Sequence, residues 1–128
     1  MKRIMLSVIA LLFFVRADAQ QKPAYVLYNA KGKKVSYKKM IRLLAKKDVV
    51  LFGEFHNNPI AHWLELTVAK DLKQKRELVF GAEMFEADNQ QALTDYLEGR
   101  INAKKLDSSA RLWNNCKTDY APLVNFAK

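Results

Sequence analysis

The sequence predicts an α/β fold, namely a parallel-sheet-centred domain with flanking helices and an N-terminal hairpin. Two short apolar runs, residues 49–52 and 78–80, have the length and composition of strands that are buried on both faces. Each run ends at a glycine that is followed by carboxylates. A helical stretch between the runs is long enough for a right-handed crossover, so the two strands should be parallel neighbours.

Residues 1–19 are expected to form a signal peptide. A basic start at Met1-Lys2-Arg3 is followed by an apolar stretch over residues 4–15 and an Ala-x-Ala pattern at residues 17–19. The apolar stretch is short for a bilayer span, and an uncleaved membrane anchor is the alternative. No cysteine lies at the cleavage point for lipid attachment. We therefore expect an exported protein, periplasmic or associated with the envelope.

The 128 residues allow one domain behind the signal peptide, with a basic hairpin and helix at 20–47 and an α/β region at 48–128. The formal net charge is +9, and segment 20–47 holds nine Lys or Arg residues and no acid. Such a segment can attract nucleic acid, anionic membranes or acidic ligands. An exported protein rarely meets nucleic acid, and no nucleic-acid motif is present, so we expect no nucleic-acid partner. A solvated surface is favoured, and a role in attracting an anionic ligand stays open.

The basic segment is predicted to hold a hairpin and one helix. Residues 25–28 and 33–35 would pair across a Lys31-Gly32 turn. Ser36 is the expected N-cap of the following helix, which should end before Asp48.

The crossover helix should begin at Asn58 and Pro59, since an Asn cap with Pro at the first helical position is a common start. It should end within residues 73–76. The residues expected to face the sheet are Ile60, Leu64, Val68 and Leu72.

The rest of the chain is predicted to be helical. A helix capped at residues 88–89 should end near Gly99, because glycine is a frequent helix stop. A loop over residues 100–107 and helices over 110–113 and 120–127 should follow. The single cysteine, Cys116, allows no internal disulfide, and we expect it to be a small buried residue, with a catalytic thiol as the alternative.

Polar residues follow both predicted strands. Glu54 and His56 come directly after the first, and Glu83 and Glu86 follow the second. Because the carboxyl ends of neighbouring parallel strands lie side by side, we expect these side chains to converge. Glu54, His56 and Glu83 could then hold a divalent metal ion with three N or O ligands. Alternatively, a glutamate could polarise His56 for proton transfer.

Each of these residues also has a purely structural interpretation. Glu54 could cap the crossover helix, His56 could be an ordinary loop histidine, and Glu83 could pair with an arginine. We favour a functional site, because the glycine-acid pattern ends two consecutive strands. His62 lies in the first turn of the crossover helix, where it would either overlook the cleft or face water.

The chain resembles the ChaN-like family of haem-binding uptake proteins from the bacterial envelope. The resemblance covers residues 48–128 and is carried by these residues: Gly53-Glu54-Phe55-His56-Asn57-Asn58-Pro59, His62, Gly81-Ala82-Glu83-Met84-Phe85-Glu86, Gln90-Gln91, Gly99, Trp113 and residues 120–127. The chain is more distantly similar to the Tiki and erythromycin-esterase-like groups. In those groups a Gly-x-x-His motif and a downstream glutamate serve metal-dependent or general-base hydrolysis.

The resemblance implies an exported protein that binds haem or another iron-bearing ligand and works with envelope uptake machinery in iron uptake. Haem needs an axial His or Tyr ligand and an apolar slot. The candidate haem ligands are His56, His62, Tyr96 and Tyr120. The candidate slot walls are Phe55, Trp63, Met84 and Phe85.

The resemblance also leaves other outcomes open. A hydrolase would use Glu54, His56 and Glu83, so whether the protein is an enzyme is undecided. Family members usually continue into a second half with further strands, so this chain resembles only the N-terminal half of the family's domain. We therefore expect an incomplete, truncated α/β domain. Such a domain could assemble its site in a homodimer or with a complementary partner chain, or it could be a non-functional fragment.

Overall fold

The computed structural model describes residues 22–128, and within that range it is a helical protein. The signal peptide expected at 1–19 lies outside the described residues. The elements are α2 (Tyr37–Leu44), α3 (Pro59–Lys73), a 3-10 turn η1 (Ala87–Asn89), α4 (Gln90–Leu97), α5 (Ala103–Ser109), a π-helical turn η2 (Cys116–Tyr120) and α6 (Ala121–Ala127). None of the helices in residues 22–128 is long and apolar enough to cross a membrane.

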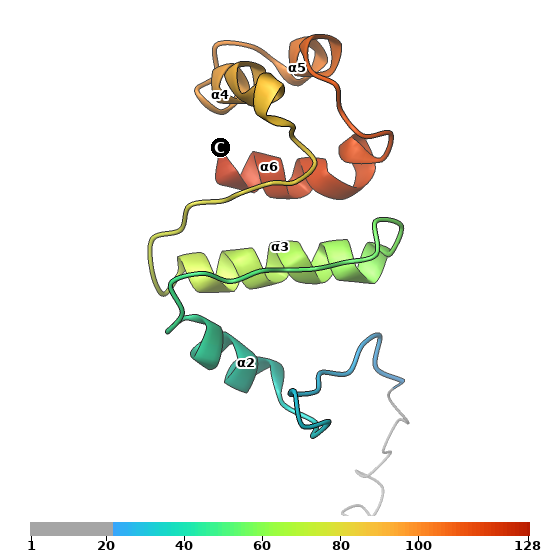
Figure 1. Cartoon of the computed structure of the whole chain (residues 1–128), viewed down its shortest axis with the longest axis vertical. Helices are drawn as coiled ribbons and strands as arrows, with labels where there is room; N and C mark the ends of the chain where they lie inside the picture. Colours follow the sequence, from blue (N-terminus) through green and yellow to red (C-terminus); the bar gives the residue numbers. More distant parts are fainter. Residues whose placement is uncertain (1–21) are drawn as a thin grey trace, which may run out of the picture.

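The predicted parallel sheet is wrong, because residues 22–128 contain no named strand. The segments expected to pair, residues 48–54 and 77–84, run without helix or strand past the helices (Figure 1). No backbone hydrogen bond joins one segment to the other. A strand requires a ladder of such bonds with a neighbour, so an apolar extended run without a neighbour does not form a sheet. The predicted hairpin is reduced to one antiparallel bridge between Tyr28 and Lys34.

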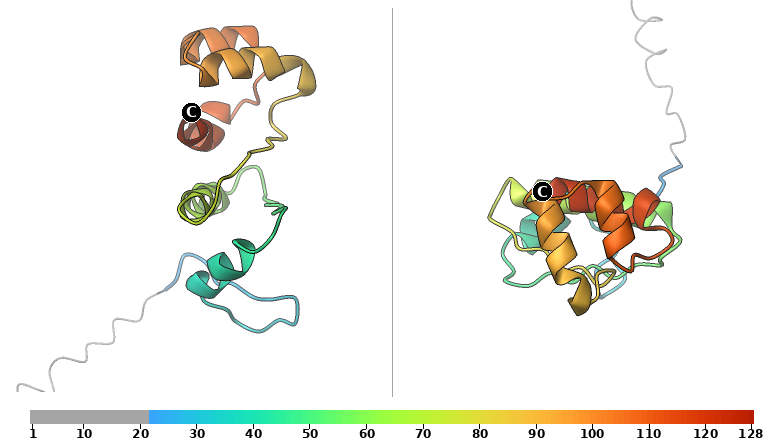
Figure 2. Two further views of the ribbon diagram at one scale, coloured as in Figure 1. Left: turned by 90° about the vertical axis from the view of Figure 1, so that its left-hand side faces the viewer. Right: turned by 90° about the horizontal axis from the view of Figure 1, so that it is seen from above.

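The helices form a column in which α2, α3, α6 and the α4–α5 pair follow one another (Figures 1 and 2). Three small apolar clusters hold this column together instead of one core. Their buried members are Ile41, Val68 and Leu72 in the first, Met84, Cys116 and Tyr120 in the second, and Tyr96, Leu106 and Val124 in the third. The expectation that Cys116 is buried is confirmed.

The starts of α2 and α3 follow the predicted caps, whereas Asn89 before α4 makes no side-chain cap hydrogen bond. The Ser36 hydroxyl accepts a hydrogen bond from the backbone N–H of Lys39 at the start of α2. The Asn58 side chain accepts from the N–H groups of Ile60 and Ala61, 3.0 and 3.2 Å away, and Pro59 opens α3. These bonds satisfy amides that the first turn of a helix leaves without partners.

Two predictions for the second half of the chain need correction. Residues 100–107 do not form a loop, because Asn102 caps α5 by accepting from the Lys105 N–H at 2.9 Å. Residues 110–113 are not helical, and the chain there leads into η2. The predicted helix end near Gly99 is confirmed, since α4 ends at Leu97 and Gly99 has a φ of 77°, which suits glycine far better than other residues.

Candidate functional site

The carboxylate of Glu54 is the centre of a hydrogen-bonded cluster. Its Oε1 accepts a hydrogen bond from the Tyr120 hydroxyl at 2.6 Å and lies 3.1 Å from Nδ1 of His56. Its Oε2 lies 3.3 Å from Nε2 of His62. The Glu54 side chain is only 8% exposed. One carboxylate therefore joins the segment before α3, the first turn of α3 and the end of η2.

The local electrostatics favour a charged Glu54. Burial by itself raises the pKa of this carboxyl, but the hydrogen bonds from Tyr120 and His56 and the nearby His62 outweigh it, so the pKa lies below its ordinary value. The pKa of the Tyr120 hydroxyl shifts in the opposite direction. Burial, together with the hydrogen bond to the Glu54 carboxylate, raises the pKa of Tyr120 above its ordinary value. At neutral pH the pair is thus a phenol that donates to a carboxylate.

His56 has one side of its imidazole fixed and the other side open. Its Nδ1 faces Glu54 and the Tyr120 hydroxyl oxygen, 3.2 Å away, and its side chain is 58% exposed. Trp113 packs edge-on against the ring with 4.8 Å between the ring centroids. Because Nδ1 faces a carboxylate, the favoured neutral tautomer carries its proton on Nδ1, which leaves the lone pair on Nε2.

The backbone of His56 is also fixed. Its carbonyl oxygen accepts a hydrogen bond from the Asn115 side-chain Nδ2 at 2.7 Å, and Nε2 of His62 lies 3.1 Å from the same oxygen. Asn115 also donates to Oδ2 of Asp119 at 2.9 Å. These contacts link the loop that carries His56 to a segment almost sixty residues later in the chain.

His62 is buried, with 6% of its surface exposed, so neither the cleft-facing nor the water-facing expectation describes it fully. Its ring packs edge-on against Tyr120 at 4.8 Å between centroids. Its Nε2 contacts the His56 carbonyl and Glu54, while its Nδ1 has no hydrogen-bond partner in residues 22–128. His62 therefore supports the cluster from inside.

Glu83 does not join this cluster. It is exposed, and it makes no hydrogen bond or ion pair in the described part of the chain. Glu86 is held elsewhere by Arg111, whose Nη2 lies 2.5 Å from its carboxylate. Within residues 22–128 no group of three His, Cys, Asp or Glu side chains is arranged to hold a metal ion. The expected metal site of Glu54, His56 and Glu83 thus finds no support.

The remaining candidate ligands and walls are scattered. Tyr96 is buried in the third apolar cluster, with 8% of its surface exposed. Its hydroxyl donates a hydrogen bond to Asn125. Met84 is also buried, whereas Phe55 is 78% exposed beside His56. Trp63 is half exposed and packs on Tyr25.

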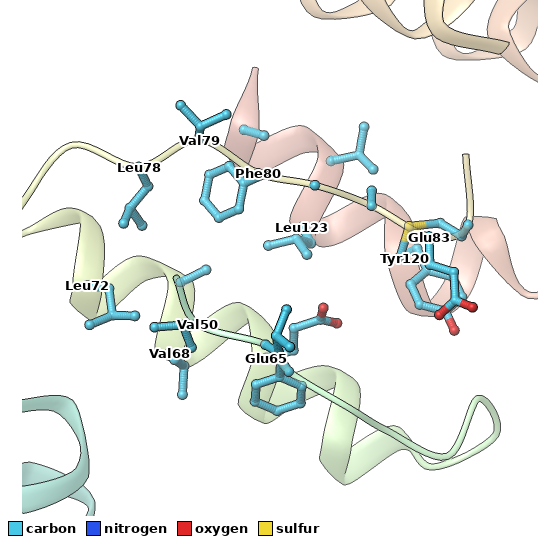
Figure 3. Close-up of a pocket in the computed structure, with 18 of the residues that line it drawn as sticks. Val50, Glu65, Val68, Leu72, Leu78, Val79, Phe80, Glu83, Tyr120 and Leu123 are labelled. Carbon is cyan, nitrogen blue, oxygen red and sulfur yellow. The ribbon is translucent and has the colours of Figure 1, made fainter. Parts of the chain in front are cut away.

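A cavity of about 860 Å³ opens between two extended segments, residues 48–54 and 77–84, and helix α3 (Figure 3). Glu54, His56, Trp113 and Tyr120 are among its lining residues. The lining is otherwise dominated by the apolar side chains of both extended segments, α3 and α6. The polar cluster thus borders an apolar space, as is common in ligand sites.

Sequence reasoning missed three members of this neighbourhood. Asn115 and Asp119 carry no motif, and Glu65 lies within the predicted crossover helix without any mark of its own. Glu65 could have been found from helical spacing, because it sits three residues after His62 and therefore on a neighbouring face. No local pattern marks Asn115 or Asp119.

Comparison with known proteins gives one match. A family described as "Haem-binding uptake, Tiki superfamily, ChaN" matches residues 40–128, which is more than half of the chain. No curated protein and no solved structure matches the chain.

Proposed function

Because the chain belongs to the ChaN family of haem-binding uptake proteins in the Tiki superfamily, we propose that it binds haem with the His56 imidazole as an axial ligand. Axial ligation requires a nitrogen or oxygen lone pair that a planar ligand can approach. His56 offers this at Nε2, because its side chain is 58% exposed and its Nδ1 is turned towards Glu54. This combination of exposure and a fixed tautomer carries the proposal.

The other candidate ligands are unsuited to this role. Tyr120 is 1% exposed, and its hydroxyl is engaged with Glu54. Tyr96 is 8% exposed, with its hydroxyl bonded to Asn125. His62 is 6% exposed, and its Nε2 contacts the His56 carbonyl. Each would have to leave its buried position and its polar contacts before it could reach a ligand.

Glu54 then has the role of a supporting carboxylate. A metal-binding histidine commonly donates its other N–H to a carboxylate, which orients the ring and raises the basicity of the ligating nitrogen. The hydrogen bonds that lower the pKa of Glu54 keep it charged for this purpose. Bound haem would supply the iron, and the residues of this chain would orient the ring that meets it.

The apolar slot is the space beside His56. Trp113 contacts the imidazole edge-on, and both residues line the apolar cavity. Burying the planar apolar surface of haem against the side chains that line this cavity would be favourable in water. We propose in addition that the protein acts in iron uptake after export, as the pattern of residues 1–19 suggests.

A haemin titration followed by visible absorbance tests the ligand. The unmodified chain should give a saturable shift of the Soret band, and His56→Ala should lose it. Asn57→Ala is the matched control, because Asn57 is exposed next to His56 and makes no hydrogen bond in residues 22–128. Adding free imidazole to the His56→Gly variant should restore the shift. An unchanged spectrum and affinity in His56→Ala would refute this assignment.

A further inference from the structure

Residues 22–47, the described part of the basic segment, carry the excess positive charge. They include nine Lys or Arg residues and no acid, whereas residues 48–128 hold ten Lys or Arg against twelve Asp or Glu. All nine basic side chains are exposed, and none of them makes an ion pair within residues 22–128. The basic residues that do pair with acids lie later in the chain: Lys73, Arg100, Arg111 and Lys117. Like charges repel one another, so an anionic partner would stabilise residues 22–47.

Helix α2 has its apolar and basic residues on opposite faces. Ile41 and its apolar neighbours on α2 pack in the first apolar cluster. Lys38, Lys39 and Arg42 are exposed instead. Residues three or four apart are neighbours on a helix, so Arg42 lies beside both lysines. We call these three residues the basic face of α2.

The positive charge is concentrated at one end of the molecule. Three further lysines, Lys31, Lys33 and Lys34, lie directly before α2, around the bridge between Tyr28 and Lys34. Figures 1 and 2 show residues 22–44 at one end of the helix column, with α4 and α5 at the other end. A molecule with such a charge distribution turns its basic end towards an anionic surface.

The composition of this end favours a broad anionic surface over a single small anion. Eight of the nine basic residues are Lys, and Lys47 alone among the nine lines the cavity beside His56. Lysines act as separate, strongly hydrated point charges, whereas recognition of one phosphate more often uses the planar fork of Arg. A spread of exposed lysines is typical of segments that bind anionic lipids.

Exposed apolar side chains accompany the charges. Val26 is 44% exposed, Leu43 49% and Tyr28 58%, and all three lie among the basic residues in the sequence. Tyrosine combines an apolar ring with a polar hydroxyl, and it is enriched where a membrane meets water. Basic and interfacial side chains in one segment suit a lipid surface better than a nucleic acid, for which no motif is present.

We propose that residues 22–47 are a docking surface for an anionic lipid membrane, with the basic face of α2 and the lysines of residues 31–34 towards the lipid phosphates. Attraction of this kind acts over about 8–10 Å at physiological salt, so it needs no lipid-binding pocket. The end of the column that carries α4 and α5 would then point away from the membrane.

The docking surface is separate from the proposed haem ligand. The carboxylate, imidazole and phenol of Glu54, His56 and Tyr120 take no part in it, and its test contains no haemin. Failure of membrane binding would therefore leave the haem proposal unchanged, and failure of haem binding would leave this one unchanged.

Cosedimentation of the full chain with lipid vesicles tests the proposal. The vesicles are pure phosphatidylcholine, or phosphatidylcholine with about one third phosphatidylglycerol, and a Lys or Arg near such an anionic surface contributes about fivefold in binding. The chain should bind the anionic vesicles at least about 100-fold more tightly at low salt, and about 0.5 M NaCl should remove the preference. Equal binding to both kinds of vesicle would overturn the proposal.

A triple variant of the basic face locates the interaction. It should bind anionic vesicles about 100-fold more weakly, at about fivefold for each lost charge, while circular dichroism shows the helices unchanged. The substitutions are Lys38→Gln, Lys39→Gln and Arg42→Gln. Residues 1–19 stay the same in both chains, so the difference between the two chains reports on α2. An unchanged affinity would overturn the proposal.

Two further triple variants complete the test. The first lies outside any helix, so it keeps the proposal testable if the α2 variant loses its helix, and it too should weaken binding about 100-fold. Its substitutions are Lys31→Gln, Lys33→Gln and Lys34→Gln. The second removes the same charge from exposed lysines in and beyond α5, and it should change binding by less than about threefold. Its substitutions are Lys104→Gln, Lys105→Gln and Lys117→Gln. Equal losses in all the triple variants would overturn the proposal, because net charge rather than this surface would then explain the binding.

Two competitors identify the anionic partner. Inorganic phosphate, at the same phosphate concentration as the lipid, should leave the chain on the vesicles, because one small anion contacts few lysines at once. Release by inorganic phosphate would indicate a single-anion site and would overturn the proposal. Release by an equal phosphate concentration of double-stranded DNA would overturn it as well, since the favoured partner would then be a nucleic acid.

Discussion

Replacing Tyr120 by Phe should destabilise the fold without removing the proposed haem ligand. The hydroxyl donates to Oε1 of Glu54 at 2.6 Å, and Tyr120 is the most deeply buried side chain described, at 1% exposure. A hydrogen bond to a charged group contributes about 1.5–3 kcal/mol. Phe keeps the ring and leaves no large cavity, so the loss should lie in this range. This loss is a sizeable fraction of the free energy of unfolding of a small domain, which is about 5–15 kcal/mol.

The destabilisation should depend on pH. The pKa of Glu54 is depressed in the folded protein, so its contribution is present above its unfolded pKa, about 4.3, and is lost as the pH falls through the lower folded value. The pKa of Tyr120 is raised in the folded protein, so the contribution of its protonated phenol is fully present below the unfolded pKa of about 10 and is lost only at a higher pH. The full cost of Tyr120→Phe should therefore appear near neutral pH and shrink in acid, once Glu54 is protonated.

Urea unfolding at neutral pH and at about pH 3 measures both effects. Tyr28→Phe is the control, because Tyr28 is 58% exposed and its hydroxyl makes no hydrogen bond in residues 22–128. The Soret shift with haemin should persist in Tyr120→Phe. A cost no larger than that of the control, or one equal at both pH values, would refute the role given to the Tyr120–Glu54 bond. A lost Soret shift in a folded variant would instead make Tyr120 the ligand.

Four further substitutions separate binding from stability. Glu54→Gln should weaken haemin affinity about 10–100-fold in absorbance titrations, because it removes the charge behind the His56 ring. His62→Ala should lower the free energy of unfolding by about 2 kcal/mol or more, since His62 is 6% exposed, while the Soret maximum stays in place. Leu72→Ala should cost about 2–5 kcal/mol, whereas Leu51→Ala, at a position 92% exposed, should stay within about 0.5 kcal/mol in urea titrations. Equal costs at the two leucines would contradict the packing described.

The helices were predictable where their signals are local. Ser36 and Asn58 act within three residues of themselves, so the caps of α2 and α3 can be read without knowledge of the fold. The end of α4 before Gly99 is equally local, because glycine adopts a positive φ without the steric cost that other residues have. The start of α5 at Asn102 has an equally local signal, which sequence reasoning overlooked.

The sheet was predicted from segments whose outcome depends on distant partners. Residues 49–52 and 78–80 have the composition of strands, and their side chains alternate as strands do. Composition sets only the tendency of a segment to extend, while a ladder requires a neighbour at hydrogen-bonding distance. Leu51 and Val79 lie in the open because that neighbour is missing among residues 22–128.

The candidate site shows the same difference between contacts that a local pattern predicts and contacts that depend on distant residues. The pairing of Glu54 with His56 was within reach of the sequence, since residues two apart on an extended backbone point to the same side. The contacts from Asn115 and Tyr120 span about sixty residues, and nothing local announces them. Glu83 was included because a parallel sheet would have brought it beside Glu54; it lines the same cavity as Glu54 and His56 but makes no hydrogen bond to either.

The two histidines of the cluster show how one carboxylate gives neighbouring side chains different roles. His56 and His62 approach Glu54 through different oxygens, Oε1 and Oε2. His56 approaches from the exposed side, so the contact fixes its Nδ1 and leaves Nε2 facing the solvent. His62 approaches from α3 and places its Nε2 inside, where the His56 carbonyl also lies within hydrogen-bonding distance. The buried His62 thus holds the backbone of His56. Because Nε2 of His62 is engaged inside and Nε2 of His56 faces the solvent, only His56 of these two histidines is free to bind a ligand.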